Sequence, residues 1–480
     1  MTPDFLRQLV NETTLFALAP FLTLCAGAML LLLADIVPGG KGLRAPLFVA
    51  SIAVAAFFEV RLLSHPTLEL FSNSFVSSPK TAMWGLLFLS SALIAWAFAQ
   101  RYYEEEKAFL AEHDVLFLCS TAGMMLMAGA QDLLTFFVGL ELLSVPLYTL
   151  AGFRRSRNDS VEAGLKYFVL GAFAAAIFLY GAALLYTGTG TISLAEMRAH
   201  GAGTPLAILG IALIAGSLFF KVSVFPFHLW VPDVYQGSPT PVTGLMATGT
   251  KAAGFAFLLN AAFLLPASAA TTLGVIAVAT MAAGNLGALV QTDLKRMLAY
   301  SGIAHAGTIL LAAAGYLAGD PQKLDGALNA ALYYMAAYVF TAGGAFGLVA
   351  LLESELGGPV TLDTLRGLSS RRPAVAAALA LFMLSLGGIP ATGGFLGKYL
   401  VFSVAVRSGM IAIAVIGVLM SVVALGYYLR VVIAMYMQKE LEGRRFANEQ
   451  RLPAALATGL CAAMVLLLGL APGWFLAFLG

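Results

Sequence analysis

Apolar runs of about 20 residues recur along the whole chain and are separated by short polar breaks. A helix of that length crosses the hydrocarbon core of a bilayer. The pattern therefore predicts an all-α polytopic membrane protein with about 14 transmembrane helices. The expected spans are residues 14–36, 45–63, 81–100, 114–130, 133–153, 161–187, 205–231, 243–266, 269–290, 297–317, 327–353, 374–406, 409–437 and 454–478.

Two of these spans contain a break, because proline removes a backbone donor from a helix. The first break is at Pro226 in the seventh span, and the second is in "LSLGGIPATGGFLGKY" around Pro390. The stretches "EAGLKYFVLG" from Glu162 and "NAALYYMAAY" from Asn329 also share Ala, Leu and Tyr at matching offsets. We therefore expect two inverted five-helix repeats, each with one broken helix. The expected units are an N-terminal three-helix segment (1–113), the first repeat (114–266), the second repeat (269–437) and a C-terminal loop with the last helix (438–480).

Charge sets the expected orientation. Only 11% of the 480 residues are charged, against about 25% in soluble domains, and the net charge of +2 is too small to indicate a nucleic-acid partner. With the N-terminus outside, 16 lysines and arginines fall in inner loops and 6 on the outer side. Basic loops stay cytoplasmic, so both termini should be periplasmic in a bacterial inner membrane. The first apolar run lacks the features of a signal peptide and should be retained as a span.

Charged residues inside the apolar spans are the main candidates for function. A charge at the bilayer centre costs roughly 2.5–3.5 kcal/mol on insertion scales, so it normally faces protein or water and has a task. The principal candidates are Glu141, Lys221, Lys251 and Lys398. The secondary candidates are Lys166, His228, Lys295 and His305. The competing interpretation is structural: a salt bridge that fixes packing, or lysines whose stems snorkel to the interface, as Lys166 and Arg430 could do.

Glu141 and Lys221 should lie at similar depth. Each is about 18–20 Å from the inner end of its span at 1.5 Å per residue, which would allow an ion pair. Burial destabilises a charged lysine and a nearby carboxylate stabilises it, so moving Glu141 would change whether Lys221 keeps its proton. Backbone groups freed at the broken helices could hold ordered water beside the lysines.

The sequence gives no indication of a bound redox group or metal. Cys25, Cys119 and Cys461 are far apart and no CxxC pair occurs, which excludes a cysteine-ligated iron–sulfur cluster in this chain. "GLMATGTK" lacks the Gly-Lys-Ser/Thr order of a phosphate-binding loop. His228 and His305 alone are a poor haem-ligand set, and His65, His113 and His200 fall in predicted loops. We expect no cofactor and no metal site in this chain.

Four motifs together resemble the antiporter-like membrane subunits of complex I, the proton-pumping NADH–quinone oxidoreductase. They are "FKVSVFPFHLWVPDVYQGSPTPVT", "GTKAAGFAF", "DLKRMLAYSGIAHAG" and "LSLGGIPATGGFLGKY", and the resemblance runs from about residue 114 to 437. It implies that Glu141 and Lys221 form the coupling pair, that Lys251 is the central relay and that Lys398 leads towards the outer exit. Lysine at position 398 and the end of the chain at Gly480 resemble the subunit N group.

The resemblance also implies a role within a larger translocase. Quinone reduction would occur in partner subunits that carry FMN and iron–sulfur clusters, and the partners of this chain would be neighbouring antiporter-like subunits and lipid. One alternative is a subunit of a multisubunit sodium–proton antiporter, which would work without electron transfer. Another is a scaffold that conducts nothing, although four buried titratable positions argue against it.

Overall fold

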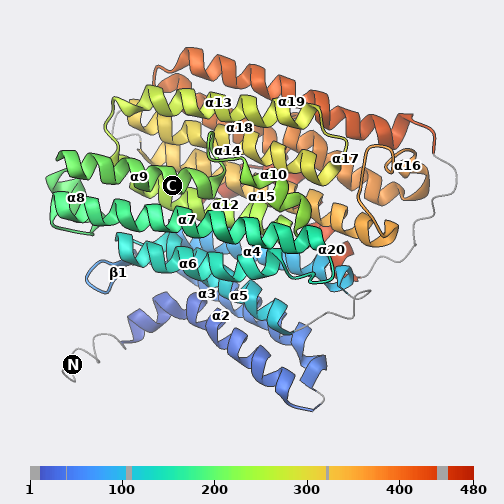
Figure 1. Cartoon of the computed structure of the whole chain (residues 1–480), viewed down its shortest axis with the longest axis horizontal. Coiled ribbons are helices and arrows are strands. Elements are labelled where there is room, and N and C mark those ends of the chain that lie inside the picture. The colour runs from blue at the N-terminus through green and yellow to red at the C-terminus, as the bar shows by residue number, and fades with distance from the viewer. Residues whose placement is uncertain (1–10, 39, 104–110, 320–323, 441–451, 480) are drawn as a thin grey trace.

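The computed structural model describes residues 11–38, 40–103, 111–319, 324–440 and 452–479, and it is built almost entirely of helices (Figure 1). Within this part of the chain, 12 helices are long and apolar enough to cross a membrane. They are α2 (Glu12–Ile36), η1 with α3 (Gly40–Leu62), α4 (Pro79–Tyr102), α6 (Leu133–Ala151), α7 (Asn158–Thr189), α9 (Pro205–Val222), the α11–η2–α12–η3 span (Thr240–Leu264), α13 (Ala269–Leu289), α14 (Leu294–Ala318), α15 (Leu324–Leu356), α19 (Ile411–Met437) and α20 (Leu452–Leu470). The expectation of an all-α polytopic membrane protein is confirmed.

The remaining elements are shorter or less apolar. They are α5 (Ala111–Gly129), α8 (Leu194–His200), α10 (Trp230–Gly237), α16 (Leu368–Arg371), α17 (Pro373–Gly387), α18 (Gly393–Arg407) and α21 (Gly473–Ala477). A two-stranded antiparallel hairpin, β1 (Leu68–Leu70) with β2 (Phe75–Ser77), follows α3. Every predicted span overlaps a helix, but three-residue strands are too short to leave a periodic signal and the hairpin was not predicted.

Both predicted helix breaks are present. α9 ends at Val222, where Ser223 has a φ of +68°, and α10 begins only at Trp230. α17 ends at Gly387, where Gly388 has a φ of +84°, and α18 begins at Gly393. A left-handed residue immediately after the last turn terminates a helix and leaves its final carbonyl groups free for other partners.

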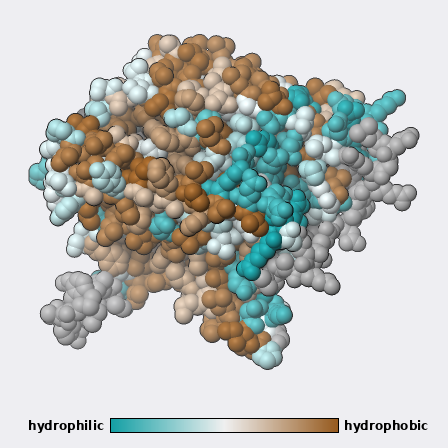
Figure 2. Space-filling model, viewed as in Figure 1, coloured by the Kyte–Doolittle hydropathy of each residue, from teal (hydrophilic) through white to brown (hydrophobic). Residues whose placement is uncertain are grey.

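The helices differ sharply in burial. The comparison uses the 18-residue apolar stretch of each helix. All residues of this stretch are buried in the α11–η2–α12–η3 span and in α15, and 94% are buried in α14. In α3, α19 and α20 only 28% are buried. Figure 1 places α2 and α3 along one edge and α13 and α19 along the opposite edge. Exposed apolar side chains on such outer helices give the brown surface in Figure 2, which suits contact with lipid.

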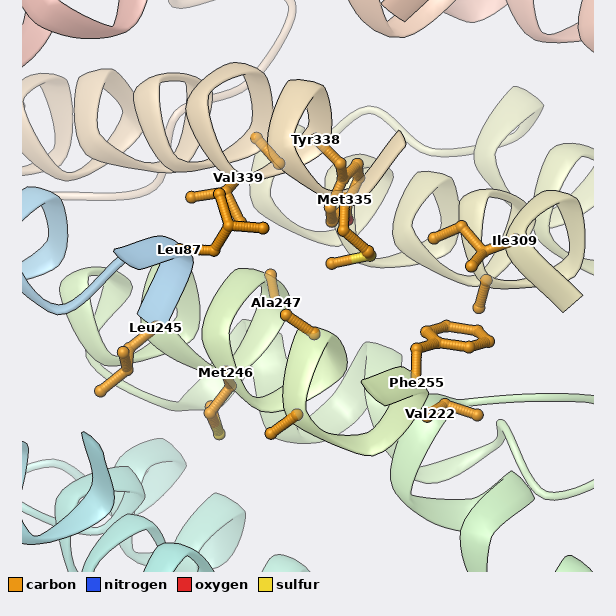
Figure 3. Close-up of a cluster of buried hydrophobic side chains, with 14 of the residues drawn as sticks. Leu87, Val222, Leu245, Met246, Ala247, Phe255, Ile309, Met335, Tyr338 and Val339 are labelled. Carbon is orange, nitrogen blue, oxygen red and sulfur yellow. The ribbon is translucent and has the colours of Figure 1, made fainter. Parts of the chain in front are cut away.

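The central helices pack through apolar side chains. Figure 3 shows Ala247 of η2 (Met246–Thr250), a π-helical turn, and Phe255 of α12 (Lys251–Ala261) facing Met335 and Val339 of α15 and Ile309 of α14. All five side chains are at most 1% exposed. Burying a polar group in close apolar packing of this kind is costly unless it is hydrogen-bonded, so polar groups between these helices need specific partners.

Helices α5 and α6 approach each other so closely that a side chain does not fit between them. A Cβ atom on Gly123 would lie 2.4 Å from the backbone nitrogen of Leu143, whereas a Cβ on Gly459 of α20 would meet nothing within 4 Å. Real Cβ atoms do not approach backbone that closely, so α6 would have to move.

We therefore predict that Gly123→Ala lowers thermal stability while the matched helical variant Gly459→Ala does not. Forcing apart a packed pair of helices typically costs about 1–3 kcal/mol, whereas glycine-to-alanine in an open helix position is neutral or stabilising. The measurement is the midpoint of thermal unfolding of the purified chain in detergent. Equal midpoints for the two variants would contradict the close approach of α5 and α6.

Candidate functional site

Lys221 is buried in the last turn of α9, directly before the first helix break, and is 6% exposed. Its Nζ donates to Ser144 Oγ at 2.7 Å and to Tyr167 OH at 3.5 Å, and it lies 5.7 Å from the centre of the Tyr167 ring. Ser144 in turn donates to the carbonyl of Leu140 at 2.5 Å. A cation in the last turn also interacts favourably with the helix dipole. The buried ammonium group of Lys221 at the end of α9 thus has side-chain hydroxyls as hydrogen-bond acceptors.

Glu141 of α6 lines the same small cavity as Lys221, about 10 Å³ in volume, together with Ser144 and Tyr148. The expected ion pair between the two is nevertheless not formed: no contact within 4 Å joins them among the described residues. Glu141 Oε1 is buried without a hydrogen-bond partner. Ser144 lies one turn beyond Leu140 and takes the position next to Lys221 Nζ. The cavity has about the smallest volume that can hold one ordered water molecule. Glu141 and Lys221 therefore line the same cavity without direct contact.

Lys251 is the first residue of α12 and follows the π-helical turn η2. It is 1% exposed, its Nζ donates to the carbonyl of Gly302 in α14 at 2.6 Å, and it lies 5.7 Å from the centre of the Tyr338 ring. The preceding residue, Thr250, has a buried hydroxyl without a hydrogen-bond partner. Single π-helical turns are frequent at functional sites because they disturb the regular backbone ladder.

Lys398 reaches across the second helix break. It belongs to α18, yet its Nζ donates to the carbonyl groups of Leu386 at 2.9 Å and Gly387 at 3.0 Å, at the end of α17. These carbonyl groups have no partner within their helix, and a cation is stabilised at the negative end of the helix dipole. Both breaks therefore place a lysine ammonium at the carboxyl end of a half-helix.

His305 of α14 connects the surroundings of Lys251 and Lys398. It lies one turn after Gly302, whose carbonyl accepts from Lys251, and it shares a cavity of about 10 Å³ with Leu386, whose carbonyl accepts from Lys398. Its ring nitrogens are hydrogen-bonded to Tyr334 OH at 2.6 Å and Tyr428 OH at 3.0 Å. A histidine ring with a partner on each nitrogen can pass a proton from one side to the other.

The other secondary candidates are placed differently. His228 is 6% exposed within the first break, and its Nδ1 is buried without a hydrogen-bond partner. Lys295, at the start of α14, is 5% exposed: its Nζ donates to the carbonyl of Ser238 at 2.5 Å and lies 4.0 Å from Glu353. The structure thus places Lys295 at the start of α14, beside Glu353.

Lys166 is not brought into the buried set. It is exposed, and it forms ion pairs with Glu162 at 2.7 Å and with Asp233 at 3.3 Å. Arg296 also contacts Asp233, at 2.9 Å. Partial burial acts to raise the pKa of Asp233, but the hydrogen bonds from Arg296 and Lys166 outweigh it and hold that pKa below its usual range.

Several functional partners were missed from the sequence. Ser144 and Tyr167 are hydrogen-bonded to Lys221, and Tyr334 and Tyr428 are hydrogen-bonded to His305. Tyr334 lies in "NAALYYMAAY", which the sequence analysis used only as evidence for a repeat. Tyrosines in apolar spans are a usable signal, because their hydroxyls need a partner when buried. The placement of His113 in a solvated loop was wrong: it is fully buried and contacts Asp114 at 3.1 Å.

The arrangement as a whole is a set of buried titratable groups in an apolar interior. Lys221, Lys251, Lys398 and His305 are each hydrogen-bonded to hydroxyl or carbonyl groups. Within the described ranges, no group of three or more His, Cys, Asp or Glu side chains could hold a metal ion. The groups present can hold and release protons, and the small cavities beside Glu141 and His305 adjoin atoms that can bind water. Proton transfer is the chemistry that these side chains support.

Comparison with known proteins agrees with this arrangement. Residues 130–424 match the family described as NADH:quinone oxidoreductase/Mrp antiporter, TM. NADH-quinone oxidoreductase subunit N of Trichlorobacter lovleyi is 40% identical, with 98% of this chain and 97% of the relative covered. A chain of respiratory complex I from Thermus thermophilus with bound aureothin is 34% identical with a TM-score of 0.80, covering 95% of this chain and 98% of that one.

The Mrp complex from Dietzia sp. provides a more distant likeness. One of its chains has a TM-score of 0.83 at 22% identity, with 97% of this chain and 96% of that chain covered, and at this identity the likeness concerns the fold alone. The match over residues 130–424 and the 40% identity along almost the whole length of a relative are decisive. The chain belongs to the NADH:quinone oxidoreductase/Mrp antiporter family of membrane subunits.

Proposed function

We propose that this chain moves protons across the membrane as a subunit of NADH–quinone oxidoreductase. The observation that carries the proposal is the series of buried ammonium groups, Lys221, Lys251 and Lys398, each hydrogen-bonded to groups of neighbouring helices or of a helix end. Relatives named as subunit N of this enzyme cover almost the whole chain. The protein acts as one part of a translocase, and the reduction of quinone takes place elsewhere in the assembly.

The proposed mechanism depends on charge separation in an apolar interior. Burial destabilises an ammonium, and a nearby carboxylate stabilises it. Glu141 and Lys221 line one cavity without direct contact, so a small displacement of α6 relative to α9 alters how strongly Lys221 holds its proton. We propose Lys251 and His305 as the central relay and Lys398 as the group that leads towards the outer side.

The finer architecture is proposed on the same basis. Adding α5 and the α17–α18 pair to the 12 apolar helices gives 14 crossings, with both termini periplasmic. Two inverted five-helix repeats, 114–266 and 269–437, would each contribute one broken helix and one lysine beside it. Segments 1–113 and 438–480 flank this core, in a bacterial inner membrane.

Partners and cofactors follow from the same proposal. FMN and iron–sulfur clusters would reside in other subunits, and neighbouring antiporter-like subunits and lipid would contact the exposed apolar helices. The alternative is a subunit of a sodium–proton antiporter. The family description names both groups, but the Mrp chain is only 22% identical to this chain, against 40% for the subunit N relative. Sodium-dependent proton exchange by the purified chain, without electron transfer, would favour that alternative.

We predict that Lys221→Met lowers proton pumping and NADH–quinone turnover by at least about tenfold. This is a lower limit, because a proton-transfer group typically contributes about 100-fold or more to a rate. The complex should still assemble, because methionine fills much of the same volume without leaving an unpaired charge. The measurement is proton uptake and NADH oxidation in membrane vesicles. The control is Lys166→Met, which removes an exposed lysine and should pump normally. Normal stoichiometry in Lys221→Met would remove Lys221 from the path.

We further predict that Lys398→Arg pumps as poorly as Lys398→Met. Arginine can donate to the carbonyl groups of Leu386 and Gly387 but does not release its proton in a protein. A lysine that only anchors the second break would tolerate arginine, whereas a lysine that passes protons would not. The measurement is the proton-to-electron ratio of both variants. A wild-type ratio in Lys398→Arg alone would show that Lys398 is structural.

A further inference from the structure

A polar cavity of about 490 Å³ is lined by Arg154, Arg157 and Lys295, which the charge distribution in the sequence predicts to lie on the inner side. It is surrounded by the end of α4, the residues before α7, the junction of α10 and α11 (Thr240–Leu245), the start of α14 and the end of α15. Figure 2 shows hydrophilic side chains concentrated on this right-hand side of the molecule, near α16 in Figure 1. The cavity is far larger than the cavities beside Glu141 and His305, and it has room for many water molecules.

Glu353 lines this cavity near the end of α15, and its side chain is largely buried, with 13% exposed. Its Oε2 accepts hydrogen bonds from Thr240 Oγ1 and, at 3.3 Å, from Tyr102 OH. Its Oε1 lies 4.0 Å from Lys295 Nζ. Arg154 donates to the same Tyr102 hydroxyl at 3.0 Å. The Glu353 carboxylate thus lies between the large polar cavity and the buried start of α11.

We propose that this cavity is the inner-side entrance for protons bound for Lys251, and that Glu353 is the residue that takes them from water. The inference rests on the proposed function, which it deepens by assigning an entrance. Glu353 was not identified from the sequence as a candidate, because it falls at the predicted end of a span, where an acid is expected to be solvated.

The path from Glu353 follows one continuous helical span. Thr240, which contacts Glu353, begins the span that carries Lys251 eleven residues later, a rise of about 16–17 Å. Between them lie the buried hydroxyls of Thr243, Thr248 and Thr250. These hydroxyls provide polar steps through an interior that is otherwise apolar.

Two independent features mark the end of this path. The π-helical turn η2 interrupts the regular backbone ladder immediately before Lys251. Thr250 Oγ1 is buried and has no hydrogen-bond partner, which is costly unless water or a mobile proton carrier meets it. Both features lie on the side of Lys251 that leads back to Glu353, where a relay would need them.

The transfer requires no further reactant. The Glu353 carboxylate takes one proton from cavity water, which the bulk reprotonates, and becomes a neutral acid. It then gives that proton through hydroxyls and water to the neutral amine of Lys251, which becomes an ammonium while Glu353 returns to a carboxylate. The transfer moves one proton, with its positive charge, from the bulk to Lys251, and the cycle closes when Lys251 passes that proton on.

The charges around the cavity argue against an anionic ligand as its occupant. Among the described residues, three cations and three acids line it, so their formal charges cancel and give no net positive field that would attract a phosphate or a lipid headgroup. They are Arg154, Arg157, Lys295, Asp159, Asp293 and Glu353. Arg157 and Asp159 pair with each other at 2.7 Å.

The first test asks whether the cavity opens to the inner side. Ser354 lines the cavity, and cysteine differs from serine by a single atom, so Ser354→Cys in the intact complex places one thiol at the wall. A charged, membrane-impermeant thiol reagent should label this variant in inside-out vesicles and not in right-side-out vesicles, with the unsubstituted chain as background. Labelling only from the outer side, or none from either side, would overturn the proposed entrance regardless of pumping.

The second test asks whether Glu353 carries protons. Glu353→Gln keeps an acceptor for Thr240 and Tyr102 but cannot titrate, so pumping and turnover should fall by about tenfold or more in the assembled complex. Glu353→Ala should be equally poor, and added formate should restore it several-fold by carrying protons into the open cavity. The matched control is Asp363→Asn, which alters an exposed acid paired with Arg366 and should pump normally.

A third variant, Lys251→Met, separates the failure of this inference from the failure of the proposed function. If Lys251→Met stops pumping while Glu353→Gln pumps normally, the entrance is rejected and the proposed function stands. If both variants pump normally, the proposed function itself fails. Loss in both variants, with formate rescue of Glu353→Ala but not of Lys251→Met, supports the entrance.

Discussion

The structure depends on one constraint: an ammonium group buried within a membrane protein must find oxygen atoms to accept its hydrogen bonds. Regular helices offer almost none, because their carbonyl groups are already paired. The chain meets the requirement in three ways. Lys398 uses the free carbonyl groups at the end of α17, Lys221 uses a serine hydroxyl next to the end of α9, and Lys251 takes the carbonyl of Gly302 on the neighbouring helix.

This constraint explains why the two helix breaks and the lysines occur together. A broken helix in an apolar interior is costly unless its exposed backbone has a partner, and a buried lysine is costly without an acceptor. At the second break, placing the two together reduces both costs, because Lys398 donates to the free carbonyl groups of Leu386 and Gly387. At the first break, Lys221 finds its acceptors in side-chain hydroxyls instead. The same polar groups then form a series along the interior, with His305 between the surroundings of Lys251 and Lys398. Apolar side chains of η2 and α15 pack against each other in the same interior (Figure 3).

Much of this fold could be predicted from the sequence, because apolar runs predict the membrane spans and prolines predict the helix breaks. The buried lysines were also predictable, since a charge in an apolar run stands out. Their partners were not, because Ser144 and Gly302 reach them only through the packing of distant helices. Equal depth wrongly suggested direct contact between Glu141 and Lys221, which depends on side-chain direction as well as depth. Glu353 was missed because position along a span cannot show that an acid faces a cavity.

The central claim is that water and titratable side chains together form a proton path through the interior. The most direct measurement is a density map of the intact complex at a resolution that shows ordered water. We predict water within hydrogen-bond distance of Glu141 Oε1 and Thr250 Oγ1, two buried oxygen atoms that have no hydrogen-bond partner among the described residues. Protein side chains closing directly on both atoms, with no water between the lysines, would contradict it.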